Sequence, residues 1–337
     1  MSKKILLSHG SGGIMSDRLI RELFVKYFHN AYLSQMTDSA LVPVNSGKLA
    51  FTTDSYVVDP IFFPGGDIGK LAVCGTVNDL SVSGAQPLYL SAGFILEEGL
   101  PLEDLEMIVR SMSEEAQKAG VQIVTGDTKI VNKGKADKVF INTAGVGVLP
   151  EKRLHVSEGR HIQPGDQVII NGSIGEHGIA VMGAREKLNI KNSVESDCAS
   201  LNHLIQEIFE KNEGVRFIRD LTRGGLASVL VEIVESRTFG IRFNETTVPV
   251  REEVKSFCEM LGFDPLYLAN EGKIVIIVSA GQADQILKEM QRHAFGINSS
   301  IIGEVVNEYQ GKVVMETEIG GTRLIDKITG EQLPRIC

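Results

Sequence analysis

Four aspartates stand out because each lies at the end of, or inside, an otherwise apolar segment. They occur in Thr52-Thr53-Asp54-Ser55, Val77-Asn78-Asp79-Leu80, Gly126-Asp127-Thr128-Lys129 and Arg219-Asp220-Leu221. Carboxylates at the ends of buried strands are well placed to hold Mg²⁺, a hard cation that takes one or two carboxylates together with phosphate oxygens. Each aspartate alone could instead cap a helix or a turn. The four together favour a site for a magnesium-bound phosphate compound.

The residues beside Asp127 strengthen this interpretation, whereas the glycine-rich segments do not. Thr128 and Lys129 add a hydroxyl group and a cation, both suited to phosphate oxygens. Residues 65–71 have the wrong glycine spacing for a P-loop and a leucine where the magnesium-binding hydroxyl should be. Residues 10–15 lack the third glycine of a dinucleotide fingerprint. A nucleotide would therefore bind by another device, for which the aspartates are the candidates.

The last residue, Cys337, carries a thiol at the end of a tail formed by residues 330–337. The tail follows the last predicted element, and chain ends are mobile unless they are tied down. Seven residues could move the sulfur through about 20 Å. The terminal carboxylate disfavours the thiolate, and Arg335 partly offsets that charge. We expect a mobile arm that carries a reactive sulfur; the alternative is an incidental residue in a frayed end.

Composition and charge limit the classes of function. The 337 residues carry a formal net charge of −9 without a basic block, which argues against a nucleic-acid partner. No stretch approaches the length of a membrane helix, and residues 1–13 lack a signal-peptide core. We therefore expect a cytoplasmic protein without a membrane partner. Cys74, Cys198 and Cys258 show no CxxC pair and no zinc spacing, and are expected to be reduced, buried thiols.

The first half of the chain alternates helical and strand patterns that would position these side chains. We expect helices from Ser16 to Tyr27, from Asp67 to Thr76 and over residues 101–119, and strands over residues 49–53, 87–96, 121–124 and 138–149. Asp54 would then end the first strand, and Asp127 would follow the third.

The sequence turns polar over residues 150–165, which predicts a domain boundary. Beyond it we expect strands over residues 167–171, 274–278, 301–305 and 312–315, and helices over residues 201–211, 225–236, 252–261 and 282–293. The fold class is then α+β, with a mixed sheet in each half. The predicted units are residues 1–150, residues 151–329 and the tail 330–337.

These segments together resemble the HypE family of hydrogenase maturation proteins, within the superfamily of aminoimidazole ribonucleotide (AIR) synthetase and selenophosphate synthetase. The matching stretches are His9-Gly10-Ser11-Gly12-Gly13, Thr53-Asp54-Ser55-Tyr56, Phe63-Pro64-Gly65-Gly66, Asn78-Asp79, Gly126-Asp127-Thr128-Lys129, Arg219-Asp220, Thr222-Arg223-Gly224-Gly225, Asn270-Glu271-Gly272-Lys273 and Pro334-Arg335-Ile336-Cys337. The aspartate motifs indicate the superfamily, and the terminal motif singles out HypE. The resemblance implies a two-domain PurM-like fold, with an N-terminal, ATP-binding mixed sheet that forms a shared barrel in a homodimer and a C-terminal α/β sandwich.

The resemblance also implies a reaction. The terminal thiol of this family receives a carbamoyl group from the carbamoyltransferase HypF. ATP then drives dehydration of the S-carboxamide to a thiocyanate, and the nitrile passes to iron on the HypC–HypD complex as a cyanide ligand of [NiFe]-hydrogenase. Cys337 would be the modified residue, and ATP and Mg²⁺ would be the cofactors. A homodimer would also shelter the long strands 87–96 and 138–149, whose edges would otherwise invite aggregation.

Roles for single residues follow from the same resemblance. Asp54, Asp79 and Asp220 would bind the metal, because phosphoryl transfer requires charge neutralisation and positioning. The implied nucleotide-binding residues are Lys70, Asn78, Asp79, Asp127, Thr128 and Lys129.

Removing protons from the amide nitrogen requires a base within hydrogen-bond reach. Glu271 is the first candidate, with an ion pair to Lys273 as its alternative role. His9 is the second candidate, although its glycine-rich neighbourhood could form a flexible lid. His177 is expected to be structural or phosphate-facing.

Two other functions stay open at this stage. One is another ATP-using enzyme of the superfamily, such as a selenophosphate synthetase, whose reactive cysteine or selenocysteine lies near the N-terminus; residues 1–13 contain none. The other is a carrier protein whose nucleotide site is regulatory.

Overall fold

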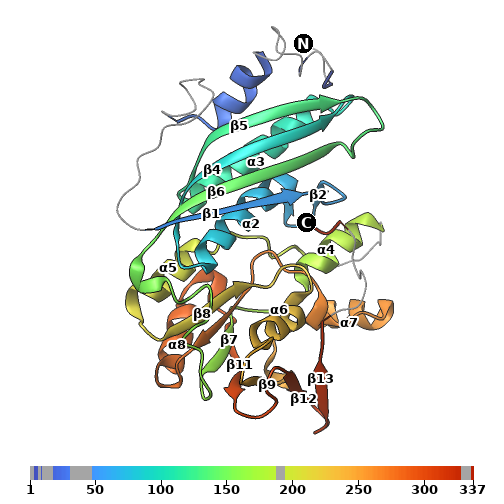
Figure 1. The fold of residues 1–337 in the computed structure, drawn as a ribbon. Coiled ribbons are helices and arrows are strands. Elements are labelled where there is room, and N and C mark those ends of the chain that lie inside the picture. The colour runs from blue at the N-terminus through green and yellow to red at the C-terminus, as the bar shows by residue number, and fades with distance from the viewer. Residues whose placement is uncertain (1–3, 7–8, 10–17, 31–47, 187–193, 328–334) are drawn as a thin grey trace.

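A computed structural model describes residues 4–6, 9, 18–30, 48–186, 194–327 and 335–337 of the chain. Two large sheets lie one above the other in Figure 1, the first within residues 48–149 and the second within residues 167–325. No helix in the described ranges is both long and apolar enough to span a membrane.

The N-terminal sheet has four strands in the order β1 (Lys48–Tyr56), β6 (Val139–Leu149), β4 (Gln86–Glu97) and β5 (Gln122–Val131). Only β4 and β5 run parallel, because a helix, α3 (Leu102–Ala119), connects them. Together with α2 (Ile68–Val82), this helix packs against one face of the sheet. On the opposite face Leu49, Phe51 and Ile95 are exposed. That face is therefore an open apolar surface.

Two short pieces complete the N-terminal domain. A small hairpin of β2 (Phe62–Phe63) and β3 (Gly66–Asp67) leads into α2, whose first turn is capped by the Asp67 carboxylate. A helical segment around the π-helix η2 (Ile20–Val25) lies near α3, with the Phe24 ring centroid 5.0 Å from that of Phe94. Ser16, the predicted cap of this helix, lies outside the described residues.

The C-terminal sheet has seven strands, of which only β9 and β12 pair in parallel. Their order is β13 (Thr322–Ile325), β12 (Val313–Glu316), β9 (Gly240–Asn244), β11 (Ser300–Val306), β7 (Gln167–Ile170), β10 (Ile274–Val278) and β8 (Val215–Asp220). All five side chains of the central strand β10 are buried, because they alternate between two cores. One core includes α6 (Gly225–Val234), and the other includes α5 (Asn202–Lys211) and α8 (Ala283–Arg292).

The predicted α+β class is confirmed, and two elements match the prediction at both ends: α7 (Glu252–Leu261) and β10. Other predictions were wrong in ways that affect the site. Asp54 and Asp127 lie inside strands β1 and β5 rather than at strand ends, and Asp79 lies inside α2. The strands extend further because their polar residues alternate with residues that face the core. Strands β8, β9 and β13 and helix α4 (Glu176–Arg185) were not predicted.

Candidate active site at the domain junction

Four carboxyl groups, two from each domain, lie close enough at the junction between the domains for their charges to interact. Asp54 comes from β1, Asp79 from α2, Asp220 from the end of β8, and Glu271 from the loop before β10. Burial and the charges of Asp220 and Asp54 raise the pKa of Asp79 to about 7, although a hydrogen bond from Thr52 Oγ1, 3.0 Å away, opposes the shift. Burial and the Asp54 charge likewise raise the pKa of Asp220. We call these four residues the unpaired cluster.

Glu271 is the most deeply buried member of the unpaired cluster. Its side-chain atom Oε1 has no hydrogen-bond partner among the described residues. Burial, followed by the charges of Asp197 and Asp220, raises its pKa well above the usual range for glutamate. The alternative role predicted for Glu271, an ion pair with Lys273, is wrong, because Lys273 pairs with Asp197 and Glu176. Glu271 is therefore a buried carboxyl group that forms no ion pair with any residue that the structure describes.

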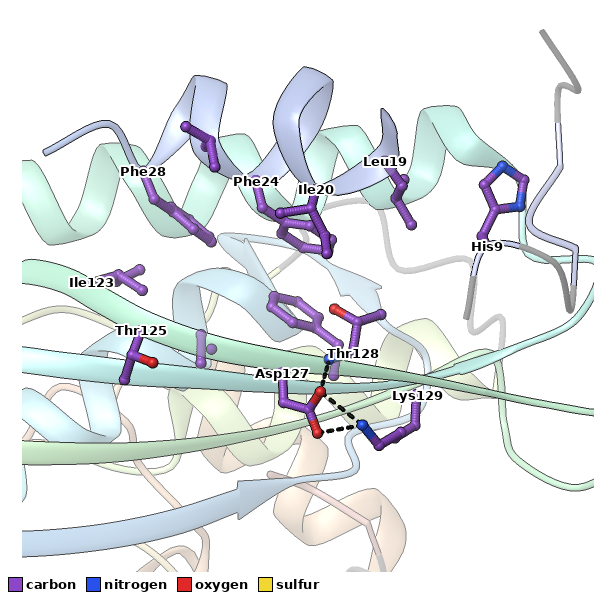
Figure 2. Close-up of a pocket in the computed structure, with 14 residues that line it drawn as sticks. His9, Leu19, Ile20, Phe24, Phe28, Ile123, Thr125, Asp127, Thr128 and Lys129 are labelled. Atoms are coloured by element: carbon purple, nitrogen blue, oxygen red, sulfur yellow. Dashed lines mark hydrogen bonds and ion pairs between the residues drawn. The ribbon is translucent and has the colours of Figure 1, made fainter. Parts of the chain in front are cut away.

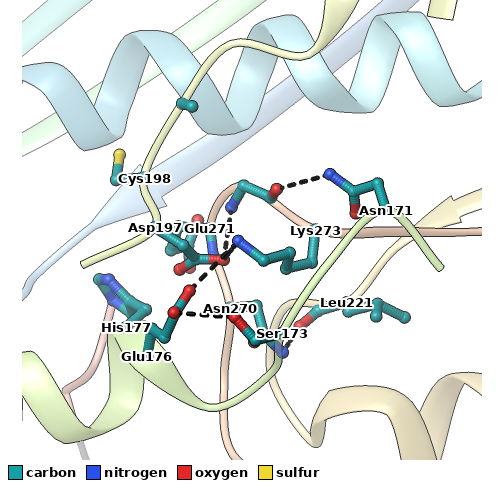
Figure 3. Close-up of polar contacts among 12 residues, drawn as sticks. Asn171, Ser173, Glu176, His177, Asp197, Cys198, Leu221, Asn270, Glu271 and Lys273 are labelled. Atoms are coloured by element: carbon teal, nitrogen blue, oxygen red, sulfur yellow. Dashed lines mark hydrogen bonds and ion pairs between the residues drawn. The ribbon is translucent and has the colours of Figure 1, made fainter. Parts of the chain in front are cut away.

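A second group, the paired cluster of Lys273, Asp197 and Glu176, holds the backbone at Glu271 (Figure 3). Lys273 Nζ lies 3.1 Å from Asp197 Oδ2 and 3.4 Å from Glu176 Oε2. The Asp197 carboxylate accepts hydrogen bonds from the backbone N–H groups of Glu271 and Gly272, at 3.1 and 3.2 Å. Burial alone would raise the pKa of Asp197, but the Lys273 charge lowers it below the usual value. A Cβ atom at Gly272 would clash with the Asp197 carbonyl, so the close approach requires glycine.

The end of the chain is docked in the same region. The backbone N–H of Val57 donates to the Cys337 carbonyl oxygen at 3.0 Å, and Arg185 Nη2 donates to the Arg335 carbonyl oxygen at 2.8 Å. The Ile336 side chain is buried in the N-terminal core. Burial and the Glu271 charge raise the pKa of the Cys337 thiol to about 12. The tail was predicted to be mobile, and that remains a prediction; in this structure its last three residues are held against the protein.

Two of the predicted nucleotide-binding residues, Asn78 and Lys70, form hydrogen bonds within the protein. Asn78 is buried; its Nδ2 donates to the Ala199 carbonyl oxygen at 3.0 Å, and its Oδ1 accepts from the Leu201 N–H at 2.8 Å. Lys70 Nζ donates to the Gly65 carbonyl oxygen at 3.0 Å. Lys70 also lines a polar cavity of about 410 Å³, whose wall includes residues of the paired cluster. Asn78 thus joins the two domains, and its predicted role toward a nucleotide is untested.

The other predicted residues lie around a separate cavity of about 270 Å³, under the N-terminal helical segment. Its wall is largely apolar and includes Phe24 and Phe28. Thr128 points toward these rings, whereas Asp127 and Lys129 point to the other side of β5, where they form an ion pair of 2.7 Å (Figure 2). His9 also lines this cavity.

The sheet order explains this separation. Strand β5 carries Asp127 and strand β1 carries Asp54, and these strands form opposite edges of the N-terminal sheet. Within one copy of the chain, the fold therefore brings together Asp54, Asp79, Asp220, Glu271 and Cys337. Other predicted residues do not join this group: Asp127, Thr128, Lys129 and His9.

Whether the site suits Mg²⁺ depends on the donor atoms that the chain provides. Among the described residues no group of three or more His, Cys, Asp or Glu side chains converges on one point as metal ligands. The unpaired cluster nevertheless consists of carboxylate oxygens, which Mg²⁺ prefers, and Glu271 Oε1 lacks a partner. A cation would relieve the repulsion that raises the pKa values of Asp79 and Asp220. The donor chemistry therefore fits the metal.

Known proteins match this chain along almost its whole length. Family models of AIR synthase related protein match it in two parts, the N-terminal domain over residues 36–149 and the C-terminal domain over residues 163–316. Carbamoyl dehydratase HypE of Rhodobacter capsulatus is 49% identical over 338 residues, which cover 99% of this chain and 98% of that protein. This chain belongs to the HypE family.

Solved HypE structures share the fold. A crystal structure of hydrogenase maturation protein HypE in complex with ATP matches with a TM-score of 0.94 and 48% identity, covering 98% of this chain and 99% of that chain. The structure of a HypE–HypF complex matches with a TM-score of 0.80 and 50% identity, covering 92% and 99%. The resemblance predicted from the sequence and the two-domain, AIR synthetase-like fold are thereby confirmed.

Several residues of the site were not predicted. Asp197 lies in a loop far from Glu271 in the sequence, and His177 contacts the tail across 159 positions. Neither contact leaves a local signal, although a histidine inside the motif Gly175-Glu176-His177-Gly178 was noticed. His177 was expected to be structural or phosphate-facing, and its buried position against the tail agrees with a structural role.

Proposed function

We propose that this protein is an ATP-dependent carbamoyl dehydratase that acts on its own C-terminus. It would convert an S-carbamoyl group on Cys337 to a thiocyanate and so supply cyanide ligands for the iron of [NiFe]-hydrogenase. The observation that carries this proposal is the docked position of Cys337, whose thiol is close enough to Glu271 and Asp54 for their charges to raise its pKa. The relatives named carbamoyl dehydratase HypE support it.

The reaction would proceed in two balanced steps. The carboxamide oxygen attacks the γ-phosphorus of ATP, which releases ADP, and the nitrogen loses one proton to give an O-phosphoryl imidate. The nitrogen then loses its second proton while the C–O bond breaks, so that inorganic phosphate leaves and S–C≡N forms. Phosphorylation is needed because an amide oxygen is a poor leaving group, and its transfer depends on positioning and charge neutralisation.

Glu271 would accept a proton from the amide nitrogen. Because its pKa is raised, Glu271 in its ionised form is a stronger base than an exposed glutamate, and it would have to lose its own proton before it accepts one. The hydrogen bonds that the Asp197 carboxylate accepts from the Glu271 and Gly272 N–H groups would hold the base in position. His9 remains the second candidate for the base, but within one chain it lies at the other cavity.

The thiol itself is better suited to be a substrate than a nucleophile in this position. With its pKa raised to about 12, docked Cys337 stays protonated near neutral pH, and a thiol attacks far more slowly than a thiolate. The carbamoyl group would therefore be attached while the tail is undocked, by a carbamoyltransferase of the HypF type. A HypE relative is known in complex with HypF, which supports this partner.

ATP and Mg²⁺ would be the cofactors. Asp54, Asp79 and Asp220 would hold Mg²⁺, which would neutralise phosphate charge. Lys70, Asn78, Asp127, Thr128 and Lys129 would contact the nucleotide. A HypE relative whose crystal structure contains ATP supports nucleotide binding.

A homodimer would complete this arrangement. On the open face of the N-terminal sheet, Phe51 is 71% exposed and Leu49 is 56% exposed, and neighbouring exposed apolar residues of this kind mark interaction surfaces. Asp127 and Lys129 lie away from Asp54 in one chain, and a shared barrel would bring a second copy of them across this face. Light scattering at micromolar concentration should give a dimer mass; a monomer mass would contradict the proposal.

The domains, the location and the last partner of the pathway belong to the same proposal. Residues 1–150 would form the ATP-binding and dimer-forming domain, residues 151–329 the AIR synthetase-like domain, and residues 330–337 the tail. The cytoplasm would be the location, and the HypC–HypD complex would receive the nitrile.

The decisive test uses protein carbamoylated on Cys337. On addition of Mg-ATP, the C-terminal peptide should lose the mass of one water, with one ADP and one phosphate released for each carbamoyl group. A carboxamide that persists after ATP is consumed would contradict the enzyme and favour the carrier protein. Formation of a phosphorylated selenium product would favour the selenophosphate synthetase.

A further inference from the structure

His177 hydrogen-bonds through both ring nitrogens in a fully buried position. Nε2 lies 2.8 Å from the Ile336 carbonyl oxygen, and Nδ1 lies 2.8 Å from Ser196 Oγ. The Phe63 ring meets the imidazole edge-on, with the centroids 5.5 Å apart. The histidine is therefore fixed on both sides and along one edge.

The direction of these hydrogen bonds follows from their partners. The Cys198 N–H donates to Ser196 Oγ at 3.1 Å, so the hydroxyl proton is free to point at His177 Nδ1. The Ile336 carbonyl can only accept, so Nε2 must carry the ring proton. Burial lowers the pKa of His177, which keeps the ring neutral and maintains this tautomer.

The same short segment, residues 196–198, also reaches Glu271. Ser196 contacts His177, and the next residue, Asp197, holds the backbone N–H groups at Glu271 and Gly272. The segment therefore contacts both His177, which binds the end of the tail, and the backbone of the proposed base. Figure 3 shows Asp197 beside Glu271.

The other hydrogen bonds to the tail carbonyl groups in the described ranges involve those of Arg335 and Cys337, whereas His177 binds that of Ile336. Val57 and Asp59 bind the tail through backbone N–H groups, and Arg185 binds the Arg335 carbonyl. Among the described residues, His177 provides the side-chain donor to the carbonyl immediately before Cys337. Its removal would leave that carbonyl, one residue before the thiol, without this partner.

We propose that His177 is a positioning residue, which latches the C-terminal tail and sets Cys337 in register with Glu271. This inference rests on the proposed function for its catalytic consequence, but the latch itself can be measured without any turnover.

The test compares two substitutions of His177. His177→Phe keeps a flat ring and removes both hydrogen bonds, whereas His177→Gln retains an N–H donor near the place of Nε2. Iodoacetamide, a small neutral reagent, would be added to uncarbamoylated full-length protein, and alkylation of Cys337 would be followed by the mass of the C-terminal peptide. Undocking exposes the thiol, so the rate reports the undocked fraction.

We expect alkylation of Cys337 to be about tenfold faster in His177→Phe than in the wild type, the effect of one buried hydrogen bond on an equilibrium. His177→Gln should stay near the wild-type rate. His203→Phe is the matched control, because His203 is exposed and bonds only the Lys118 carbonyl. Equal rates in His177→Phe and the wild type, or equal acceleration in His177→Gln, would overturn the latch.

A second measurement connects the latch to the reaction. In carbamoylated protein, His177→Phe should lower the single-turnover dehydration rate by a similar factor without changing the KM for ATP. If the phenylalanine variant fails to fold, Ser196→Ala replaces it, because this change removes the partner that orients Nδ1. An unchanged alkylation rate in Ser196→Ala would then overturn the latch.

The latch and the proposed function can fail separately. If the alkylation rates are as expected but carbamoylated wild-type protein never loses water, the proposed function fails and the latch stands.

Discussion

Two clusters of buried acidic side chains meet at Glu271 and differ in how their charges are balanced. In the paired cluster, Asp197 and Glu176 share Lys273, and Asp197 also accepts two backbone N–H groups. In the unpaired cluster, burial and neighbouring carboxylate charges raise the pKa values of Asp79, Asp220 and Glu271, and one oxygen of Glu271 has no partner in the described part of the chain. The pKa of Asp197 is lowered, whereas that of Asp79 rises to about 7.

The difference in charge balance suggests different roles for the two clusters, one in holding the backbone and one in the reaction. A buried charge that is fully paired fixes the backbone around it and has no capacity left for a ligand. Buried carboxyl groups that repel one another are costly for the folded protein, and shifted pKa values of this kind concentrate at functional sites. We therefore propose that the unpaired cluster would bind the phosphates of ATP, the metal and the modified thiol, and that the paired cluster would hold it in position.

The largest expected effect is from Cys337→Ala. Because the thiol would be the substrate, this change should abolish nitrile formation completely. Binding of Mg-ATP, measured by calorimetry, should stay within about twofold, since the aspartates remain. Loss of ATP binding in this variant would show that the tail forms part of the nucleotide site.

Glu271→Gln should have the next largest effect. It removes the proposed base but keeps the size of the side chain, so we expect dehydration of carbamoylated protein to slow by about 10²–10⁴-fold. The free energy of unfolding should not fall, because a group that is repelled by Asp197 and Asp220 has been neutralised. A normal single-turnover rate would remove Glu271 from the reaction and direct attention to His9.

Lys273→Met tests the paired cluster by removing the cation that Asp197 and Glu176 share, so that Asp197 loses its ion pair while Glu176 keeps Arg251, 3.7 Å away. Breaking a buried pair in this way costs about 3–5 kcal/mol of unfolding free energy, which urea denaturation would measure. Lys255→Met is the matched control, because its pair with Glu252 is exposed and should contribute about 0–1 kcal/mol. Equal effects of the two substitutions would contradict the distinction between the clusters.

The smallest expected effect concerns Asp79 and pH. Its pKa is raised by folding, so the native state binds this proton more tightly than the unfolded chain does. The resulting stability is fully present below about pH 4, the unfolded pKa, and is lost as the pH rises through about 7. Asp79→Asn should therefore be more stable than the wild type at pH 8 without Mg-ATP, by roughly 1–2 kcal/mol. If urea denaturation gave the same difference in unfolding free energy between Asp79→Asn and the wild type at pH 4 and at pH 8, that result would contradict the repulsion.

Elements with a local pattern were predictable from the sequence, whereas those defined by tertiary packing were not. Helix α7 shows apolar positions at helical spacing and ends before Gly262, and β10 is a continuous apolar run. Strand β8 alternates arginines with apolar residues, and a glycine-rich stretch conceals the start of α4, so both were missed.

The same limit applies to the site. Asp54, Asp79, Asp220, Glu271 and Cys337 were chosen by residue type and motif, and the structure brings them together. The paired cluster could not be predicted, because Asp197 meets Glu271 across 74 positions and no pattern in either segment indicates the other. Asp127 and Lys129 were grouped with Asp54 from the sequence, but sheet order separates them.

The central claim is that ATP activates the oxygen of a carboxamide on Cys337 at the unpaired cluster. The most direct measurement carbamoylates the wild-type protein with a group whose oxygen is replaced by its heavy isotope, and adds Mg-ATP for one turnover. The account predicts that the label leaves in inorganic phosphate, because that oxygen is phosphorylated before the C–O bond breaks. Unlabelled phosphate, with the heavy oxygen retained on the protein or released in water, would contradict it.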